Sequence, residues 1–239
     1  MAIRAIIFDW DGTLVRDESG ALSMPANAVA QYARRHLHFA LRDEDFERAF
    51  QAVLPDYKPG ESTSAPSIRQ LIAGAFTWLG WSVGTSDVES CSRLFFDAAT
   101  RAMVVYDDAR AVLSSLRYRG YVVGVVTNSL FPGDYFGVRV NELGLSGYVD
   151  AFVSSADVGL AKPHPAPFLR VLDTLQIDPH EAIFVGDRAD TDIAGARAAG
   201  MRAVLLERRG RAREASGYLV IERLGALNDI LGEGLASAD

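Results

Sequence analysis

The clearest indication of the fold is the stretch Arg4-Ala-Ile-Ile-Phe-Asp9-Trp-Asp11-Gly-Thr13, in which a run of apolar residues ends at two carboxylates. The apolar residues 5–8 predict a short buried strand. Gly12 permits a tight turn directly behind the carboxylates. We therefore expect a strand whose carboxyl end presents Asp9 and Asp11 to a site.

Beyond residue 107, strand-like and helix-like segments alternate along the chain. Strands are predicted at 121–126, 151–154, 182–185, 202–206 and 218–221, and helices at 109–116, 168–175, 192–199 and 224–231. Such alternation favours an α/β fold in which helices cover both faces of a parallel sheet. The strand at 4–8 can join that sheet, so we predict one core formed by residues 1–17 and 104–239.

Residues 18–103 follow a different pattern. Apolar residues recur at helical spacing in four segments, which predicts four amphipathic helices that share a core. The loop at 54–65 is rich in proline, glycine and serine and separates the first two helices from the last two. Cys91 lies on the fourth apolar stripe and is expected to be a small core residue.

Composition excludes several classes of protein. The formal net charge is −7, whereas a protein that binds duplex nucleic acid usually has a basic excess. The apolar run at 5–8 is too short for a signal peptide, and no segment approaches the ~20 apolar residues that span a bilayer. With one cysteine, the chain forms no intrachain disulfide. We expect a cytoplasmic protein without a membrane or nucleic-acid partner.

Polar groups that could bind a phosphate follow four of the predicted strands. They are Asp9 and Asp11 after the strand at 4–8, Thr127 and Asn128 after 121–126, Lys162 after 151–154 and a connector, and Asp187 and Asp192 after 182–185. Ligands of open parallel sheets bind outside the carboxyl ends of the strands. Each group alone could belong to a solvated turn or a helix cap, but together they predict a phosphoryl-transfer site.

Asp9 and Asp11 supply the covalent chemistry in this interpretation. The carboxylate of Asp9 can attack phosphorus and form an acyl phosphate. Asp11 reaches the same centre if Trp10 turns away. It would protonate the leaving oxygen and later take a proton from the attacking water. The plainer alternative is a solvated turn that ends a strand.

Asp187 and Asp192 predict a magnesium site. Mg²⁺ combines a few carboxylate oxygens with water and substrate phosphate, and it would relieve the repulsion between a phosphate and Asp9. Asp192 could instead cap the next helix. The hydroxyl of Thr127 and the amide of Asn128 can donate hydrogen bonds to phosphoryl oxygens.

The chain has only two lysines among its 24 basic residues. Lys162 therefore indicates a position that needs a compact ammonium, which would neutralise a phosphate and Asp9 together. Lys58, the other lysine, lies in the loop at 54–65. By the same reasoning it is a candidate contact for the substrate's leaving group, and the alternative is a solvated loop lysine.

These motifs and their order resemble those of the haloacid-dehalogenase-like hydrolase superfamily. The matching residues are Asp9-Trp-Asp11-Gly-Thr13, Thr127, Lys162-Pro163, and Gly186-Asp187 with Asp192. The resemblance covers nearly all of residues 1–17 and 104–230. It implies a Rossmann-like core, the residue roles given above, and a magnesium ion that also binds the backbone carbonyl of Asp11. It further implies that residues 18–103 form a helical cap domain that closes over the active site.

Asp11 distinguishes between the activities of that family. Members that cleave carbon–halogen bonds or phosphonates lack an acid at this position. The resemblance therefore favours a phosphatase that acts on a small phosphorylated metabolite. A sugar phosphomutase with the same nucleophile stays open, and a haloacid dehalogenase is less favoured. A non-catalytic domain would lack one of these residues, and none is missing. The substrate and the oligomeric state, monomer or homodimer, stay open.

Overall fold

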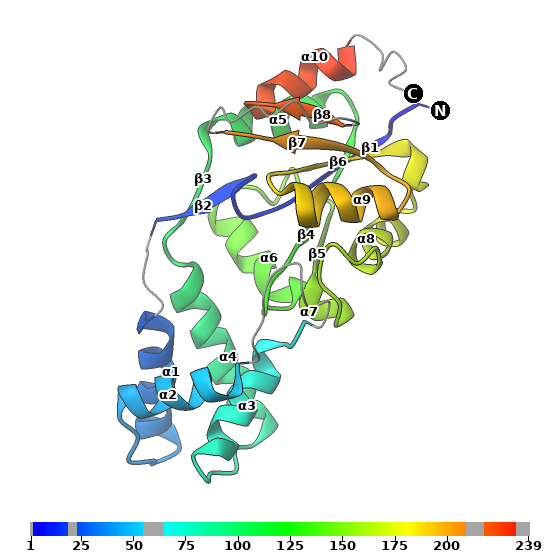
Figure 1. The fold of residues 1–239 in the computed structure, drawn as a ribbon. Coiled ribbons are helices and arrows are strands. Elements are labelled where there is room, and N and C mark those ends of the chain that lie inside the picture. The colour runs from blue at the N-terminus through cyan, green and yellow to red at the C-terminus, as the bar shows by residue number, and fades with distance from the viewer. Residues whose placement is uncertain (1, 19–22, 55–64, 209–217, 233–239) are drawn as a thin grey trace.

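The computed structural model describes residues 2–18, 23–54, 65–208 and 218–232. Lys58 lies outside the described residues, so its role stays a prediction. A parallel sheet of six strands forms the centre of the fold, in the order β5-β4-β1-β6-β7-β8. The strands are β1 (Ala5–Phe8), β4 (Val122–Thr127), β5 (Ala151–Ser154), β6 (Ala182–Gly186), β7 (Arg202–Leu206) and β8 (Leu219–Ile221), as Figure 1 shows. The sheet confirms the predicted α/β fold.

Helices pack beside this sheet and bury both of its faces. They are α5 (Asp107–Tyr118), α6 (Gly133–Glu142), α7 (Ser155–Val158), α8 (Ala166–Leu175), α9 (Ala194–Ala198) and α10 (Leu227–Gly232). Ile6 and Phe8 of β1 are buried in a cluster with apolar residues of α5 and α6. Ala5 and Ile7 are buried in a second cluster with residues of α8 and α9. Successive residues of a strand face opposite sides, so a strand covered on both faces requires the continuous apolar run that β1 has.

The register of the sheet brings the ends of distant segments together. Phe8 of β1 is paired with Val125 of β4 and with Val185 of β6. Asp9 and Asp187, one and two residues beyond these positions, therefore leave the sheet at the same edge. The pairing of the strands alone is therefore enough to bring Asp9 and Asp187 close together.

The helical insert, residues 18–103, leaves the core after β1 and returns to it before α5. The insert is entered just after β2 (Val15–Asp17) and left through β3 (Met103–Val105), and its described helices are α1 (Ser23–His36), α2 (Asp43–Val53), α3 (Ile68–Trp78) and α4 (Thr85–Thr100). β2 and β3 pair antiparallel, so the two chain crossings lie side by side. The four helices lie together at one end of the molecule (Figure 1). Cys91 is fully buried in α4, as predicted.

The helical insert is held against the core along α6. Glu89 of α4 accepts hydrogen bonds from Arg69 of α3 at 2.6 Å and from the hydroxyl of Tyr135 of α6 at 3.0 Å. The guanidinium groups of Arg69 and Arg93 lie 4.9 and 4.5 Å from the centre of the Tyr135 ring. The buried apolar cluster of the insert is also continuous with the α5–α6 face of the sheet. The division into a core and a cap domain stays a prediction.

Several elements were not predicted from the sequence, among them β2, β3, α6 and the four-residue helix α7. β2 and β3 have three residues each, too few to establish a period of two. α6 contains Gly133 and Gly137, and glycine weakens a helical pattern. The helix predicted at 192–199 begins earlier, with a π-helical turn at Ala189–Ile193. None of the described helices is long and apolar enough to cross a membrane.

Candidate active site

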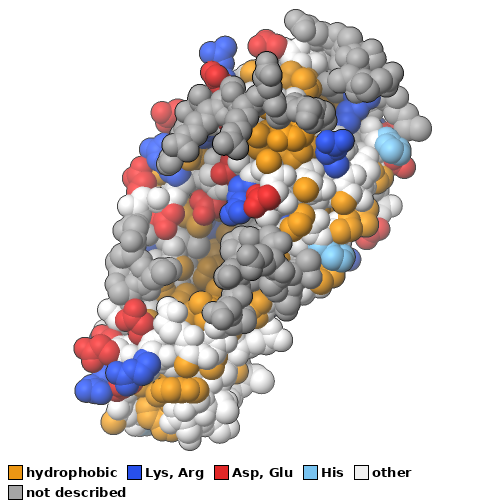
Figure 2. Space-filling model, in the orientation of Figure 1, with side chains coloured by type: hydrophobic (Ala, Val, Ile, Leu, Met, Phe, Trp, Pro, Cys, Tyr) orange, Lys and Arg blue, Asp and Glu red, His pale blue; other side chains and the backbone are white. Residues whose placement is uncertain are grey.

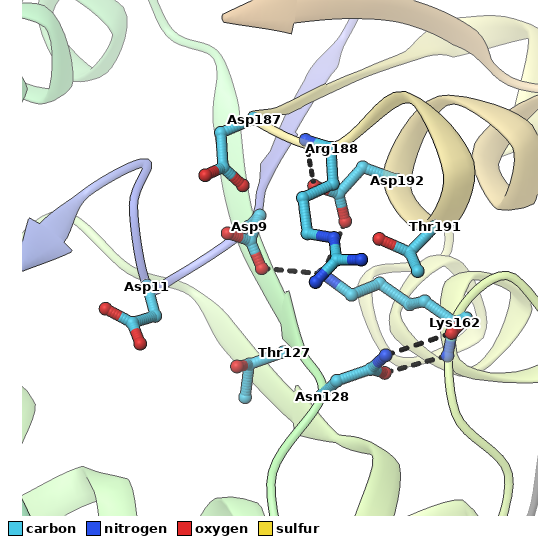
Figure 3. A pocket seen from close by; sticks show the side chains of 9 residues that line it. All are labelled: Asp9, Asp11, Thr127, Asn128, Lys162, Asp187, Arg188, Thr191 and Asp192. Carbon is cyan, nitrogen blue, oxygen red and sulfur yellow. Dashed lines mark hydrogen bonds and ion pairs between the residues drawn. The ribbon is translucent and has the colours of Figure 1, made fainter. Parts of the chain in front are cut away.

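The carboxyl ends of the central strands enclose a pocket of about 190 Å³. It is lined by Asp9, Asp11, Thr127, Asn128, Lys162, Asp187, Arg188, Thr191 and Asp192 (Figure 3). Seven of these nine are site residues expected from the sequence, and Arg188 and Thr191 are additional. In the space-filling view, acidic and basic side chains gather between the sheet and the helical insert (Figure 2).

The turn after β1 places Asp9 and Asp11 on the pocket. The amide of Asp9 donates to the carbonyl of Val185 at 2.9 Å, which extends the pairing of β1 with β6. Trp10 is buried, with its ring edge-on to Phe152 at 5.2 Å between centroids. Trp10 therefore turns away from the pocket, which is the condition under which both carboxylates reach one centre. Asp9 is buried, whereas Asp11 lies exposed at the pocket mouth.

Gly12 is the residue that this turn requires. Its φ of +84° lies in the left-handed region that side chains disfavour. A Cβ at this position would also collide with Oδ2 of Asp187. The close approach of the turn to Asp187 thus depends on the absence of a side chain at residue 12.

Lys162 lies at the floor of the pocket between two carboxylates. Its Nζ is 2.6 Å from Oδ1 of Asp9 and 2.7 Å from Oδ1 of Asp192, and it donates to the carbonyl of Val126 at 3.1 Å. Its side chain is only 3% exposed. Burial alone would lower the pKa of Lys162, but the charges of Asp192 and Asp9 outweigh it and raise the pKa above its ordinary value. The ammonium group therefore stays protonated.

Asn128 fixes the backbone of Lys162. The side-chain Nδ2 of Asn128 donates to the carbonyl of Lys162 at 2.9 Å, and the amide of Lys162 donates to Oδ1 of Asn128 at 2.7 Å. The amide group of Asn128 is thus engaged with protein, and a contact with substrate stays a prediction. Thr127 is buried at the end of β4, and its side chain points into the pocket beside Asp9 (Figure 3).

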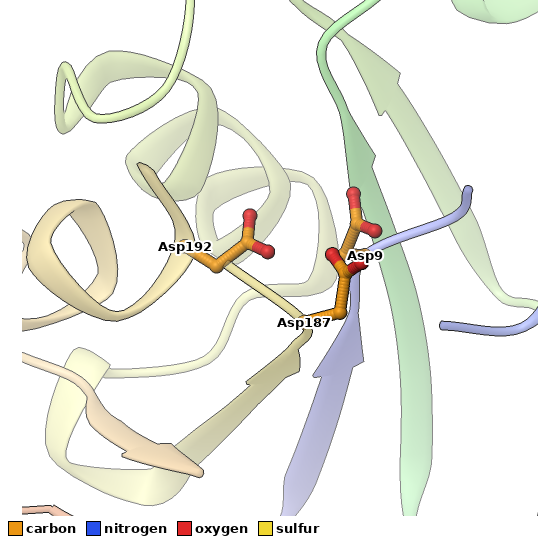
Figure 4. Close-up of side chains that lie close together, drawn as sticks. All are labelled: Asp9, Asp187 and Asp192. Atoms are coloured by element: carbon orange, nitrogen blue, oxygen red, sulfur yellow. The ribbon is translucent and has the colours of Figure 1, made fainter. Parts of the chain in front are cut away.

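Asp9, Asp187 and Asp192 form an acidic cluster. One oxygen from each lies within 4.8 Å of the others (Figure 4). Desolvation raises the pKa of Asp9 to about 7, with a further rise from the charge of Asp192, even though Lys162 lowers it. Desolvation and the charge of Asp192 likewise raise the pKa of Asp187 to about 6.

The acidic cluster fits a divalent cation that prefers oxygen ligands. The raised pKa values show that negative charge is disfavoured at Asp9 and Asp187, and a cation between them would relieve that cost. Neither histidine nor cysteine lines the pocket, and a pure carboxylate set suits magnesium better than zinc. Asp192 also holds protein groups, because its Oδ2 accepts from the amide of Arg188 at 3.1 Å while its Oδ1 faces Lys162.

Asp11 has the environment of a proton donor. Desolvation and the charge of Asp17 raise its pKa above the ordinary aspartate value. A carboxyl with a raised pKa holds its proton nearer to neutral pH, as a general acid must.

The sequence offered little to identify Arg188 or Thr191. Arginine is the ordinary basic residue of this chain, so Arg188 carries no compositional signal. Both residues face the pocket because the π-helical turn at Ala189–Ile193 folds back toward the strand end. That turn is visible only in the tertiary structure.

Comparisons with known proteins identify the family of the chain. A family model described as haloacid dehalogenase-like hydrolase matches residues 3–200. The chain is 29% identical to a glyceraldehyde 3-phosphate phosphatase of Methanopyrus kandleri over 86% of this chain and 84% of that protein. It is 31% identical to a phosphoglycolate phosphatase of Rhodospirillum rubrum over 96% of this chain and 91% of that protein.

A solved structure extends the similarity to the whole fold. The crystal structure of a 2-haloacid dehalogenase from Pseudomonas syringae pv. Tomato matches with a TM-score of 0.70 and 25% identity, covering 97% of this chain and 99% of that one. The family match includes the positions of Asp9, Thr127, Lys162 and Asp187. The chain therefore belongs to the haloacid dehalogenase-like hydrolases.

Proposed function

We propose that this protein is a magnesium-dependent phosphatase that acts on a small phosphorylated metabolite through a phospho-aspartate on Asp9. The observation that carries the proposal is the presence of Asp11, with a raised pKa, on the same pocket as Asp9 and Lys162. An ester oxygen leaves phosphorus more readily when it is protonated. A halide needs no such proton, so the site is better suited to phosphate esters than to carbon–halogen bonds.

The first step transfers the phosphoryl group to the enzyme. An oxygen of Asp9 attacks phosphorus, and the bond between phosphorus and the ester oxygen breaks. Asp11 donates its proton to that oxygen, so the leaving group departs as an alcohol. Lys162 keeps Asp9 oriented and its charge compensated, and Thr127 offers its hydroxyl to a phosphoryl oxygen.

The second step releases phosphate. A water molecule attacks phosphorus while Asp11, now ionised, takes one of its protons. The bond between phosphorus and the Asp9 oxygen breaks, which restores the Asp9 carboxylate and yields inorganic phosphate. Asp11 regains its proton and is ready for the next ester.

Magnesium would be held by Asp9, the backbone carbonyl of Asp11 and Asp187, with Asp192 as a further candidate ligand. When bound, it would neutralise the phosphate charge that otherwise repels Asp9. The helical insert, as a cap domain, would exclude bulk water from this site when it closes over the pocket.

Several relatives support a phosphatase. They carry names that include glyceraldehyde 3-phosphate, phosphoglycolate and phosphoserine phosphatase. The second candidate is a sugar phosphomutase, which would pass the phosphoryl group from Asp9 to another hydroxyl instead of to water. Haloacid dehalogenase activity is a third candidate, favoured by the 0.70 TM-score to the Pseudomonas syringae dehalogenase.

A screen of phosphorylated metabolites with Mg²⁺ tests the proposal through release of inorganic phosphate. Asp9→Asn should abolish turnover. Asp11→Asn should accumulate phospho-enzyme that can be detected by mass spectrometry after an acid quench. Asp173→Asn, an exposed carboxylate of α8, is the matched control and should turn over normally. Near-normal rates in Asp9→Asn would contradict the assignment. Transfer of the phosphoryl group without free phosphate would favour the phosphomutase, and halide release in a parallel assay with a 2-haloacid would favour the dehalogenase.

A further inference from the structure

Two cationic side chains line the pocket within the described part of the chain, and they differ in burial and in their ion-pair partners. Lys162 is 3% exposed and faces two carboxylates at 2.6 and 2.7 Å, so its charge is already compensated. Arg188 is 47% exposed and pairs with Asp190 through Nε at 3.2 Å and Nη2 at 2.9 Å. Asp190 is itself 60% exposed and does not line the pocket.

The pair between Arg188 and Asp190 is easily exchanged. Ion pairs between solvated side chains contribute only about 0–1 kcal/mol, because water solvates both charges well when they separate. A guanidinium offers two parallel N–H donors that match a carboxylate or phosphate. Arg188 can therefore leave Asp190 for a substrate anion at small cost.

Depth in the pocket indicates which part of a substrate Arg188 would meet. The phosphoryl group must reach Asp9, which is buried next to Lys162 and Thr127 at the floor. Arg188 lies nearer the solvent, and Figure 3 shows its guanidinium in front of Lys162. Its place above the floor suits the leaving group rather than the transferred phosphoryl group.

The charge of the pocket favours such a contact for an anionic leaving group. Four carboxylates line it, those of Asp9, Asp11, Asp187 and Asp192. Lys162 is already compensated by two of these carboxylates, and a bound Mg²⁺ would face the phosphoryl group, so among the described residues Arg188 is the cation of the pocket that is left for a second negative charge on the substrate. Arg188 lines the same pocket of about 190 Å³ as Asp9, so an anion held by Arg188 would lie close to the phosphoryl group, which favours a short leaving group.

We propose that Arg188 is a specificity-determining residue that binds a carboxylate on the leaving group, so that the preferred substrates are phosphate esters of short hydroxy acids. This inference rests on the proposed phosphatase activity. It adds a recognition role for a side chain at the pocket mouth that is distinct from the nucleophile, the acid and the metal ligands. Arg188 exchanges Asp190 for the substrate carboxylate on binding.

The test compares 2-phosphoglycolate with its carboxamide analogue, which has nearly the same shape but no second charge. p-Nitrophenyl phosphate reports the phosphatase chemistry independently of the carboxylate, and a bisphosphate of similar length reports whether a second phosphate can replace it. The variants are Arg188→Gln, which removes the charge, and Arg188→Lys, which keeps the charge but lacks the two parallel N–H donors of the guanidinium. Arg42→Gln is the matched control, because Arg42 forms a similar two-point pair with Asp45 in the helical insert.

The wild-type enzyme should prefer the acid to its carboxamide. A charge-assisted hydrogen bond is worth about 1.5–3 kcal/mol, so Arg188→Gln should lower kcat/KM for the acid by about 10- to 150-fold, mainly through KM. The same variant should change kcat/KM for the carboxamide and for p-nitrophenyl phosphate less than about threefold. Arg188→Lys should fall between, and Arg42→Gln should match the wild type.

Three results would overturn the inference. The first is equal kcat/KM for acid and carboxamide in the wild-type enzyme. The second is an equal loss for all esters in Arg188→Gln, which would place Arg188 on the phosphoryl group. The third is a preference for the bisphosphate over the acid. Each of these leaves the phosphatase assignment standing, because p-nitrophenyl phosphate is still hydrolysed. Absence of phosphate release from every ester would instead overturn the proposed function, and this inference with it.

Discussion

Replacing Lys162 with methionine tests the electrostatics at the centre of the site. Nζ of Lys162 lies 2.6 Å from Asp9 and 2.7 Å from Asp192, and all three side chains are buried. Methionine keeps an unbranched side chain but removes the charge, which leaves two buried carboxylates without their partner. Removing one member of a buried ion pair costs about 3–5 kcal/mol. We expect the free energy of unfolding of the metal-free protein to fall by about that amount at pH 8.

The loss should depend on pH in a direction fixed by Asp9. Its pKa is already raised from 3.8 to about 7, and Lys162 is a group that lowers it. Without Lys162 the pKa of Asp9 rises further, so the folded protein holds this proton more tightly than the unfolded chain does. Stability from such a group is present at low pH and is lost as pH rises through the folded-state pKa. The difference in the free energy of unfolding between variant and wild type should therefore be smaller at pH 5 than at pH 8.

Urea denaturation followed by circular dichroism, in EDTA at pH 5 and pH 8, measures this difference. Arg117→Met is the matched control, because Arg117 forms a 2.8 Å pair with Asp150 while 51% exposed. It should cost less than about 1 kcal/mol at either pH. A Lys162→Met protein as stable as wild type at pH 8 would refute the reasoning. A loss of equal size at both pH values would show that packing, rather than charge, holds the site together.

Three further predictions concern the metal side of the pocket. Gly12→Ala should weaken Mg²⁺ activation of phosphatase activity by about 10- to 100-fold, because its Cβ would displace the Asp187 carboxylate. The control Gly80→Ala, with a φ of +81° and nothing near the added carbon, should leave Mg²⁺ titrations unchanged. In EDTA, the melting temperature of the wild-type protein should fall as pH rises from about 5 to about 8, because the folded state holds the proton of Asp9 with a pKa of about 7. Saturating Mg²⁺ should make the melting temperature less dependent on pH. A melting temperature that rises over this range would contradict the assignment. Exhaustive chelation should abolish activity and Mg²⁺ should restore it, whereas full activity in EDTA would rule out the proposed metal requirement.

Much of the fold could be predicted because it is encoded by local patterns. The four apolar residues before Asp9 predict a strand covered on both faces, and β1 is one of the two central strands of the sheet. The alternation of segments after residue 107 predicts a parallel sheet, since parallel neighbours need helical crossovers. Elements whose signal is short or interrupted were not predicted. β2 and β3 owe their existence to pairing with each other, which is a property of the pair and not of either segment.

Part of the candidate site could likewise be predicted from the sequence, and part could not. The sequence by itself determined which groups follow which strand ends, and the common direction of parallel strands then brings Asp9, Thr127 and Asp187 to one edge. It did not determine the partners within the pocket. Only the tertiary structure decided that the amide of Asn128 holds the backbone of Lys162 and that Arg188 faces the pocket. These contacts join segments that are distant in the chain or depend on the conformation of a turn. The periodicity of apolar residues does not predict where the side chains of a turn point.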